Sequence, residues 1–167
     1  MDVMLGGIPI RLHNGPPQQE YDVLDGGSTV LRRSGGAAVK MTHYTKAVIA
    51  ISGTGWMGPG FEGLDFSEPL ELRCTQQDSL TSTTLTGTIP GTPRPDKAPW
   101  ALAYIEGDWT LTPVAMVGLD FTITEVPGAL QYQVCWMPMF TVFCRPPRRA
   151  MDPSNNIHTW SFTAEEV

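Results

Sequence analysis

Glycine and proline interrupt this chain so often that their spacing restricts which secondary structure can form. The 167 residues include 17 glycines and 15 prolines, and no stretch offers a dozen consecutive good helix formers. Because glycine weakens a helix and proline breaks it, this spacing excludes a helical bundle and a doubly wound α/β fold. We expect an all-β fold in one domain over residues 1–167, either a split β-barrel or a sandwich of short antiparallel strands with long Gly/Pro-rich loops.

Period-two alternation of apolar and polar residues predicts about a dozen short strands. The first alternation covers residues 8–12, and the last covers residues 160–165. Residues 21–24, 28–33 and 37–41 are separated by glycine pairs, which supply positive φ at the reversals. These three segments therefore predict a β-meander.

Residues 100–106 and 109–113 predict a β-hairpin. Gly107 and Asp108 lie between them, with glycine in the first position as a type II′ turn prefers. Residues 90–99 precede this hairpin and contain four prolines, which hold a chain extended and limit strand pairing. We expect a surface excursion there with a disordered tip.

The three cysteines are predicted to be reduced. Residues 130–137 and 141–145 predict a second hairpin, in which Cys135 lies opposite Cys144. Two small apolar side chains that pack across strands fit an odd cysteine count better than a disulfide. The first ten residues include Asp2 and lack both a basic stretch and a long apolar stretch, so no secretory signal is expected and the protein is made in the cytoplasm.

The chain is acidic but weakly charged, which restricts its partners. Eleven Lys and Arg residues oppose 17 Asp and Glu residues, giving a formal net charge of -6, and only 17% of residues are charged. Phosphate backbones and anionic membranes repel such a chain, so we expect neither sequence-specific nucleic acid nor a membrane as partner. A neutral surface favours a subunit that covers its apolar faces in an assembly.

Gly53, Gly55 and Gly58 match the dinucleotide-binding pattern G-x-G-x-x-G and follow a predicted strand. That pattern also requires a helix whose N-terminus faces the pyrophosphate. Pro59 and Gly60 occupy the place where the helix should begin, and no βαβ unit surrounds them. We interpret the segment as a glycine-rich loop and expect no bound cofactor.

Candidate metal ligands and nucleophiles do not form a recognised pattern. The three histidines and three cysteines show neither C-x-x-C nor H-x-x-H spacing. Four carboxylates lie close in sequence without the spacing of an EF-hand loop, and a solvated acidic rim explains them better. They are Glu62, Asp65, Glu68 and Glu71. No serine has a motif-linked histidine and acid, so we expect no metal and no enzymatic activity.

Apolar side chains concentrate in residues 53–68, where no strand periodicity would direct them into a core. We expect this loop to contact a neighbouring subunit, together with the edge strand that residues 48–51 predict. The β-branched run there suits a strand that is covered on both faces or lies at a subunit contact, and we expect it to be buried. The residues assigned to the contact are Trp56, Met57, Phe61, Leu64 and Phe66 of the loop and Val48, Ile49 and Ile51 of the strand.

Three stretches of the first half of the chain resemble a known family. They are residues 5–13 (LGGIPIRLH), residues 51–60 (ISGTGWMGPG) followed by Leu64-Asp65, and residues 71–75 (ELRCT). Together they resemble a tail protein of long-tailed bacteriophages (siphophages), and the distal tail or upper baseplate ring protein in particular.

This resemblance implies a split β-barrel that assembles into a homo-oligomeric, sixfold ring and joins the tail tube to the baseplate. It also implies a virion protein of the tail, made in the host cytoplasm, without enzymatic activity and with other tail and baseplate proteins as partners. Three alternatives stay open. Many distal tail proteins carry a second, C-terminal domain, and this chain is too short for a large one, so a tail tube subunit is a close competitor. A carbohydrate-binding β-sandwich needs exposed Trp or Tyr beside polar residues in a groove, and a small enzyme needs a pocket of titratable groups.

Overall fold

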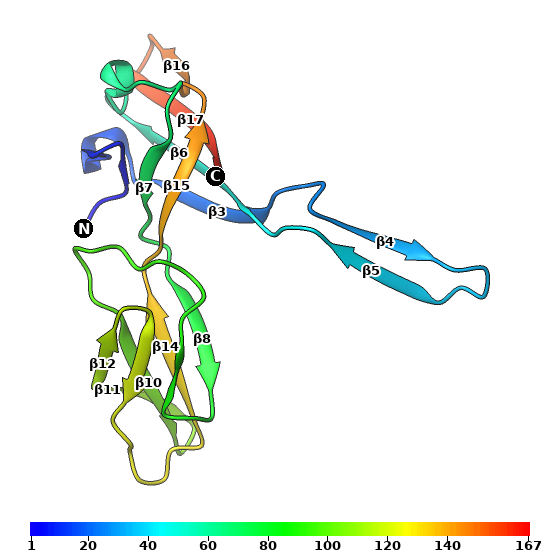
Figure 1. The fold of residues 1–167 in the computed structure, drawn as a ribbon. Coiled ribbons are helices and arrows are strands. Elements are labelled where there is room, and N and C mark those ends of the chain that lie inside the picture. Colours follow the sequence, from blue (N-terminus) through cyan, green and yellow to red (C-terminus); the bar gives the residue numbers. More distant parts are fainter. The chain divides into compact units, whose positions relative to one another are not determined.

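The computed structural model describes residues 1–167 and contains 17 β-strands and two short 3₁₀-helices (Figure 1). The helices η1 (Leu12–Asn14) and η2 (Phe61–Gly63) have three residues each. The all-β class is therefore confirmed. The pairings arrange the strands in open sheets, as in a sandwich, and close none of them into a barrel.

The contacts divide the chain into two compact units, whereas the sequence predicts one domain over residues 1–167. Unit 1 comprises Met1–Val3 and Arg73–Phe140, and unit 2 comprises Met4–Leu72 and Thr141–Val167. The chain thus passes from one unit to the other three times. The main segment of unit 1 is inserted between the two segments of unit 2.

One large sheet forms most of unit 2. Its strands are β1 (Met4–Leu5), β2 (Ile8–Pro9), β3 (Gln18–Val23), β6 (Ala47–Gly55), β7 (Leu70–Arg73), β15 (Met139–Cys144), β16 (Arg148–Asp152) and β17 (Ile157–Glu166). They follow the order β2-β1-β7-β15-β17-β6-β3, and β16 also pairs with β17. Because β6 lies between β17 and β3, residues 48–51 are in an interior strand, and the prediction of an edge strand there is wrong.

The pairing of β6 with β17 builds the core of unit 2. These strands are registered over eight residue pairs, and alternate residues face opposite sides of the sheet. The buried face carries Ile49, Ile51, Trp160, Phe162 and Ala164. Phe61 of η2 packs edge-on against Phe162, with ring centroids 5.9 Å apart. Burial of each isoleucine stabilises the unit by roughly 2 kcal/mol.

The hairpin of β4 (Ser28–Arg32) and β5 (Ala38–Thr42) pairs with no other strand. Figure 1 shows it continuing away from the ends of β3 and β6. The predicted β-meander is wrong, because β3 pairs with β6 and not with β4. Alternation predicts that a segment is a strand, but the partner depends on side chains elsewhere in the chain.

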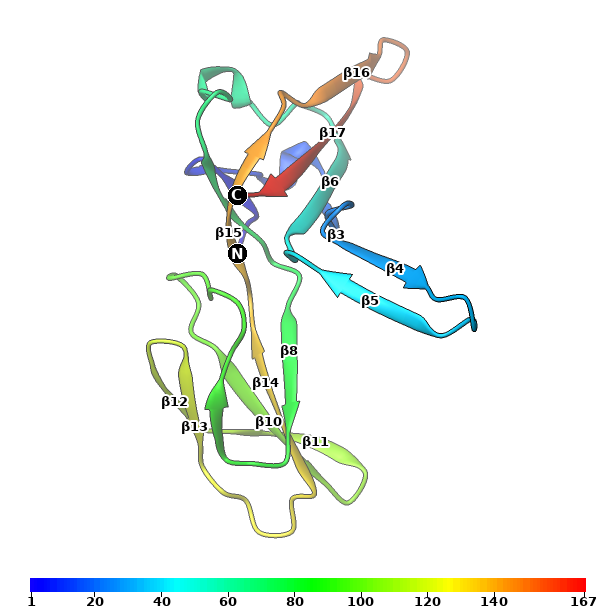
Figure 2. The ribbon, with the colours of Figure 1, turned by 45° about the vertical axis from the view of Figure 1, so that its right-hand side comes forward.

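Unit 1 consists of two sheets around one core (Figure 2). The four-stranded sheet has the order β11-β10-β14-β8, with β8 (Asp78–Ser82), β10 (Trp100–Ile105), β11 (Asp108–Thr112) and β14 (Gln131–Trp136). The three-stranded sheet has the order β12-β13-β9, with β9 (Thr86–Thr88), β12 (Val114–Val117) and β13 (Asp120–Ile123). The core contains Ile89, Ala101, Ala103, Phe121, Ile123, Tyr132, Val134 and Trp136.

Strands β10 and β11 form the first predicted hairpin, but the turn lies one residue earlier. Ile105 pairs with Asp108, so Glu106 and Gly107 are the two loop residues. Both have positive φ, 51° and 92°. Positive φ at both positions is the pattern of a type I′ turn and not of the predicted type II′ turn.

The second predicted hairpin does not form. Strand β14 pairs with β10 and β8, whereas β15 pairs with β17 and β7. Pro138 lies between β14 and β15 and makes an isolated bridge to Pro93, so the chain leaves one sheet and enters the next. Cys135 and Cys144 consequently lie in different sheets, and all three cysteines are buried free thiols. Burial raises the pKa of the Cys135 and Cys144 thiols.

Arg94 anchors the proline-rich stretch at residues 90–99, which the sequence predicts to have a disordered tip. Its side chain is buried, and its guanidinium donates five hydrogen bonds of 2.7–3.1 Å. The acceptors are the carbonyl oxygens of Asp2 and Cys74 and both carboxylate oxygens of Asp96. These bonds use every donor that a guanidinium has. The bonds to Asp96 lower the pKa of that carboxyl group.

Replacing Arg94 should destabilise unit 1 strongly. Arg94→Ala removes five hydrogen bonds and the buried cation that pairs with Asp96, so we expect the free energy of unfolding to fall by about 3 kcal/mol. Denaturant titration followed by tryptophan fluorescence measures the change. Lys97→Ala, which removes an exposed cation from the same stretch, should cost less than about 1 kcal/mol. Equal losses for the two variants would contradict the anchoring role.

Candidate functional site

The base of the glycine-rich loop is fixed by η1. The Nδ2 of Asn14 donates hydrogen bonds to the carbonyl oxygens of Met57, at 3.3 Å, and Gly58, at 2.7 Å. The backbone carbonyl of Asn14 accepts a hydrogen bond of 2.7 Å from the indole N–H of Trp160 in the core. Asn14 is itself buried. The loop backbone is therefore tied to the core of unit 2 at residues 57 and 58.

Two glycines of the G-x-G-x-x-G pattern serve close packing. A Cβ on Gly53 would lie 2.4 Å from the ring of Trp160, and a Cβ on Gly55 would lie 2.4 Å from the backbone of Asn14. A Cβ on Gly58 would meet open space. The loop is followed only by η2, a single turn, and not by the helix that a pyrophosphate requires. Packing thus explains the first two glycines without a nucleotide.

The structure separates the residues assigned to the subunit contact into exposed and buried sets. Trp56 is 58% exposed and Met57 is 42% exposed. Leu64, Phe66 and Val48 are half-buried, whereas Phe61, Ile49 and Ile51 are buried inside unit 2. Only the first two offer a fully open apolar surface, which we name the loop patch (Trp56 and Met57). The N–H of Trp56 donates to the carbonyl oxygen of His13, and the two rings meet edge-on at 5.5 Å.

Two acidic residues of the loop, Glu62 and Asp65, interact with neighbours on their own chain. Glu62 forms an ion pair with Arg149 of β16, and both side chains are exposed. Asp65 accepts hydrogen bonds from the hydroxyl and the N–H of Ser67, which lower the pKa of Asp65. Nowhere in residues 1–167 do three His, Cys, Asp or Glu side chains converge as metal ligands.

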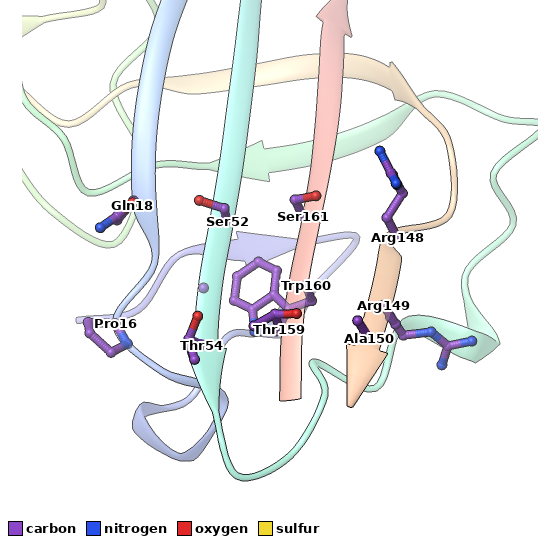
Figure 3. Close-up of a pocket in the computed structure, with 11 residues that line it drawn as sticks. Pro16, Gln18, Ser52, Thr54, Arg148, Arg149, Ala150, Thr159, Trp160 and Ser161 are labelled. Atoms are coloured by element: carbon purple, nitrogen blue, oxygen red, sulfur yellow. The ribbon is translucent and has the colours of Figure 1, made fainter. Parts of the chain in front are cut away.

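A shallow depression of about 480 Å³ lies over the strands β3, β6, β17 and β16 (Figure 3). Its lining includes four hydroxyl side chains, those of Ser52, Thr54, Thr159 and Ser161. Arg148 stands at one side of it, whereas Arg149 points away from it (Figure 3). No His, Cys, Asp or Glu lines the depression, so the lining supplies no general base and no acidic metal ligand.

Sequence reasoning missed an exposed apolar surface on the β4–β5 hairpin. Its register places four side chains on one face, those of Thr29, Leu31, Val39 and Met41. Leu31 is 53% exposed and Met41 is 44% exposed. The opposite face carries Lys40 and Arg32 and also Val30, which is 56% exposed. A two-stranded hairpin is marginally stable by itself in water, so its uncovered apolar side chains make the hairpin a candidate contact surface.

The charge of the hairpin opposes that of the rest of the chain. Residues 26–46 contain four of the eleven Lys and Arg residues and none of the 17 Asp and Glu residues. The remaining residues hold seven cations and 17 acids, a net charge of -10, against +4 for the hairpin segment. This contrast is visible in the sequence and could have marked the segment as a candidate contact surface.

Comparison with known proteins adds no family to this picture. No family model, no curated protein and no solved structure matches the chain. Among the helices, none has the length and apolar character needed to cross a bilayer. The evidence on function therefore comes from the surfaces of the chain itself.

Alanine substitutions in the glycine-rich loop should lower the free energy of unfolding where a neighbour leaves no room for a Cβ, and should change it little where the Cβ meets open space. Gly55→Ala places a methyl group against the backbone of η1, so we expect a loss of about 3 kcal/mol in the free energy of unfolding. Gly58→Ala should change it by less than about 0.5 kcal/mol, because the added methyl group meets open space. Thermal and denaturant unfolding measure both values. A stable Gly55→Ala protein would show that the pattern is not explained by packing.

Proposed function

We propose that the chain is a structural subunit of a bacteriophage tail, which assembles into a homo-oligomeric ring like a distal tail protein. The observation that carries the proposal is the exposed apolar face of the β4–β5 hairpin, which no strand of its own chain covers. The resemblance of residues 5–13, 51–60 and 71–75 suggests the phage tail as the place of assembly. A tail tube subunit is the alternative.

Charge favours another copy of the same chain as the partner of the hairpin. A segment of charge +4 is attracted to a surface whose remaining charge is -10, and every copy supplies both. A contact between two different patches of identical subunits is head-to-tail, and such a contact makes a ring when its rotation closes. The resemblance to distal tail proteins suggests sixfold closure.

The loop patch is the second surface of the proposed assembly. Trp56 and Met57 are exposed on a backbone that Asn14 holds in place. Aromatic and methionine side chains on an ordered backbone lose little conformational entropy when they become buried in a contact. An ordered patch of this kind suits a contact with the neighbouring subunit or with another tail protein.

The acidic balance agrees with a ring through which DNA passes. A lumen lined by acids repels the phosphate backbone, so DNA slides without binding. The proposal assigns no catalytic step, cofactor or membrane contact to the chain. It places the protein in the virion tail, after synthesis in the host cytoplasm.

Native mass spectrometry of the full chain, together with labelling of the chain in intact particles, tests the proposal. For a distal tail protein we expect a homo-oligomer of six copies and a label at the junction of tail tube and baseplate. A label distributed along the tail would favour a tail tube subunit. Particles that lack the chain, or that contain it as a lone monomer, would contradict the proposal.

The hairpin face provides the first mutational prediction. The double variant Leu31→Ser, Met41→Ser makes the apolar face polar, so we expect oligomers to dissociate at concentrations at least about tenfold higher than for the parent. Val30→Ser changes an equally exposed residue on the opposite face and should leave assembly unchanged. Analytical ultracentrifugation measures both. Parent-like assembly of the double variant would exclude the hairpin face as a contact.

The loop patch provides the second mutational prediction. Trp56→Ala removes the largest exposed side chain of the patch, and we expect weaker assembly with little change in the free energy of unfolding. Val117→Ala, in the other unit, is the matched control for loss of an exposed apolar side chain. Incorporation into particles and unfolding titrations are measured in parallel. Normal incorporation of a folded Trp56→Ala protein would limit the loop to a structural role.

A further inference from the structure

The outward face of the four-stranded sheet in unit 1 is uncharged and aromatic. Ala101, Ala103 and Val134 of this sheet point into the core, so the residues that alternate with them point outward. Leu102, Leu111, Ser79 and Cys135 occupy outward positions; Leu111 is 70% exposed, whereas Cys135 is buried. The other outward positions hold three aromatic residues, two glutamines and a threonine, which we name the platform. They are Trp100, Tyr104, Trp109, Gln131, Gln133 and Thr81.

The register places the polar residues of the platform directly beside the rings. Tyr104 pairs with Trp109 on one side and with Gln131 on the other. The rings of Tyr104 and Trp109 have centroids 5.0 Å apart and an interplanar angle of 50°. Gln133 pairs with Thr81 across the next strand. Leu102 lies between Trp100 and Tyr104 and pairs with Gln133, so aromatic, aliphatic and amide groups together cover all four strands.

The platform extends over several sugar-sized units. Trp100 and Tyr104 lie four residues apart on β10, so their Cα atoms are separated by roughly 13 Å along the strand. Lys97 lies over the Trp100 ring at 5.5 Å and marks that end of the surface. Trp109 is 37% exposed and Thr81 is exposed, whereas the two glutamines are half-buried. A surface of this length fits a chain of linked rings better than a single small molecule.

We propose that the platform binds a neutral polysaccharide. One face of a sugar ring presents C–H groups, which stack on the π-face of Trp and Tyr. The rim of the ring presents hydroxyl groups, which both donate and accept hydrogen bonds, as the glutamine amides do. No outward position of the four strands carries a charged side chain, and Lys97, which lies over the Trp100 ring, is the one cation that the structure places at this face, so a neutral glycan suits it better than a nucleic acid or a charged glycan.

The glutamines distinguish a polysaccharide from an apolar protein face. Gln131 lies beside Tyr104, and Gln133 lies between Leu102 and Thr81. A dry protein contact would bury both amides, and the partner would have to supply a matching donor or acceptor for each of their polar atoms. A polysaccharide supplies hydroxyl groups along its whole length and satisfies them in any register. The inference stands independently of the proposed role in a phage tail, because it uses only the surface of unit 1.

Sedimentation of the full chain with insoluble polysaccharides tests the inference. Microcrystalline cellulose, chitin and granular starch serve as probes, and the bound fraction is measured against protein concentration. We expect saturable binding to at least one of them, with little dependence on salt. Trp109→Ala should weaken that binding about tenfold, and Trp109→Tyr should retain most of it, because the ring is kept.

Two controls identify the platform as the binding surface. Val117→Ala changes an exposed residue of the other sheet of unit 1 and should bind like the parent. Gln133→Ala should weaken binding, because it removes an amide without touching a ring. The proposal is overturned if none of the three polysaccharides is bound saturably or if Trp109→Ala binds like the parent. It is also overturned if Trp109→Ala changes only self-association, since the face would then be a contact between copies.

Discussion

The pairing of β6 with β17 is the constraint on which unit 2 depends. Residues about a hundred positions apart meet in eight register pairs, and the register decides which side chains of both strands are buried. It places the Trp160 ring over Gly53, where only a glycine leaves room. The indole N–H of Trp160 also donates a hydrogen bond to the backbone carbonyl of Asn14. The side-chain amide of Asn14 in turn donates to the carbonyl oxygens of Met57 and Gly58, next to the exposed Trp56. The exposed loop thus owes its conformation to a buried ladder.

In unit 1, a buried arginine and not a strand pairing fixes the irregular segment at residues 90–99. This proline-rich stretch forms no strand. The guanidinium of Arg94 fixes it instead, through five hydrogen bonds to backbone and carboxylate oxygens. A fully satisfied buried network of this kind rigidifies its surroundings, whereas an incomplete one would be costly. With that stretch anchored, the two sheets share one apolar core and leave the platform on the outside.

The surfaces of the two units differ in chemistry, which suggests a division of roles. Unit 2 presents an apolar hairpin face beside basic residues and a tryptophan on a fixed loop, a combination that suits protein contacts. Unit 1 presents rings beside neutral amides, a combination that suits sugars. A tail protein that assembles through one unit and holds a cell-surface glycan with the other would use both. Each role has its own test, so either can fail without the other.

The sequence alone determined the all-β class, the approximate position of most strands, the first hairpin and the absence of a nucleotide-binding context after Gly58. These features depend on local propensity and period, which a short window contains. Strand partners are different: β3 with β6, the separate β4–β5 hairpin and the passage from β14 to β15 all required the tertiary structure. So did the burial of Phe61, the five bonds of Arg94 and the platform, because each depends on which distant strands meet and in which register. The β-branched run at residues 48–52, by contrast, already predicted burial, and Ile49 and Ile51 are buried.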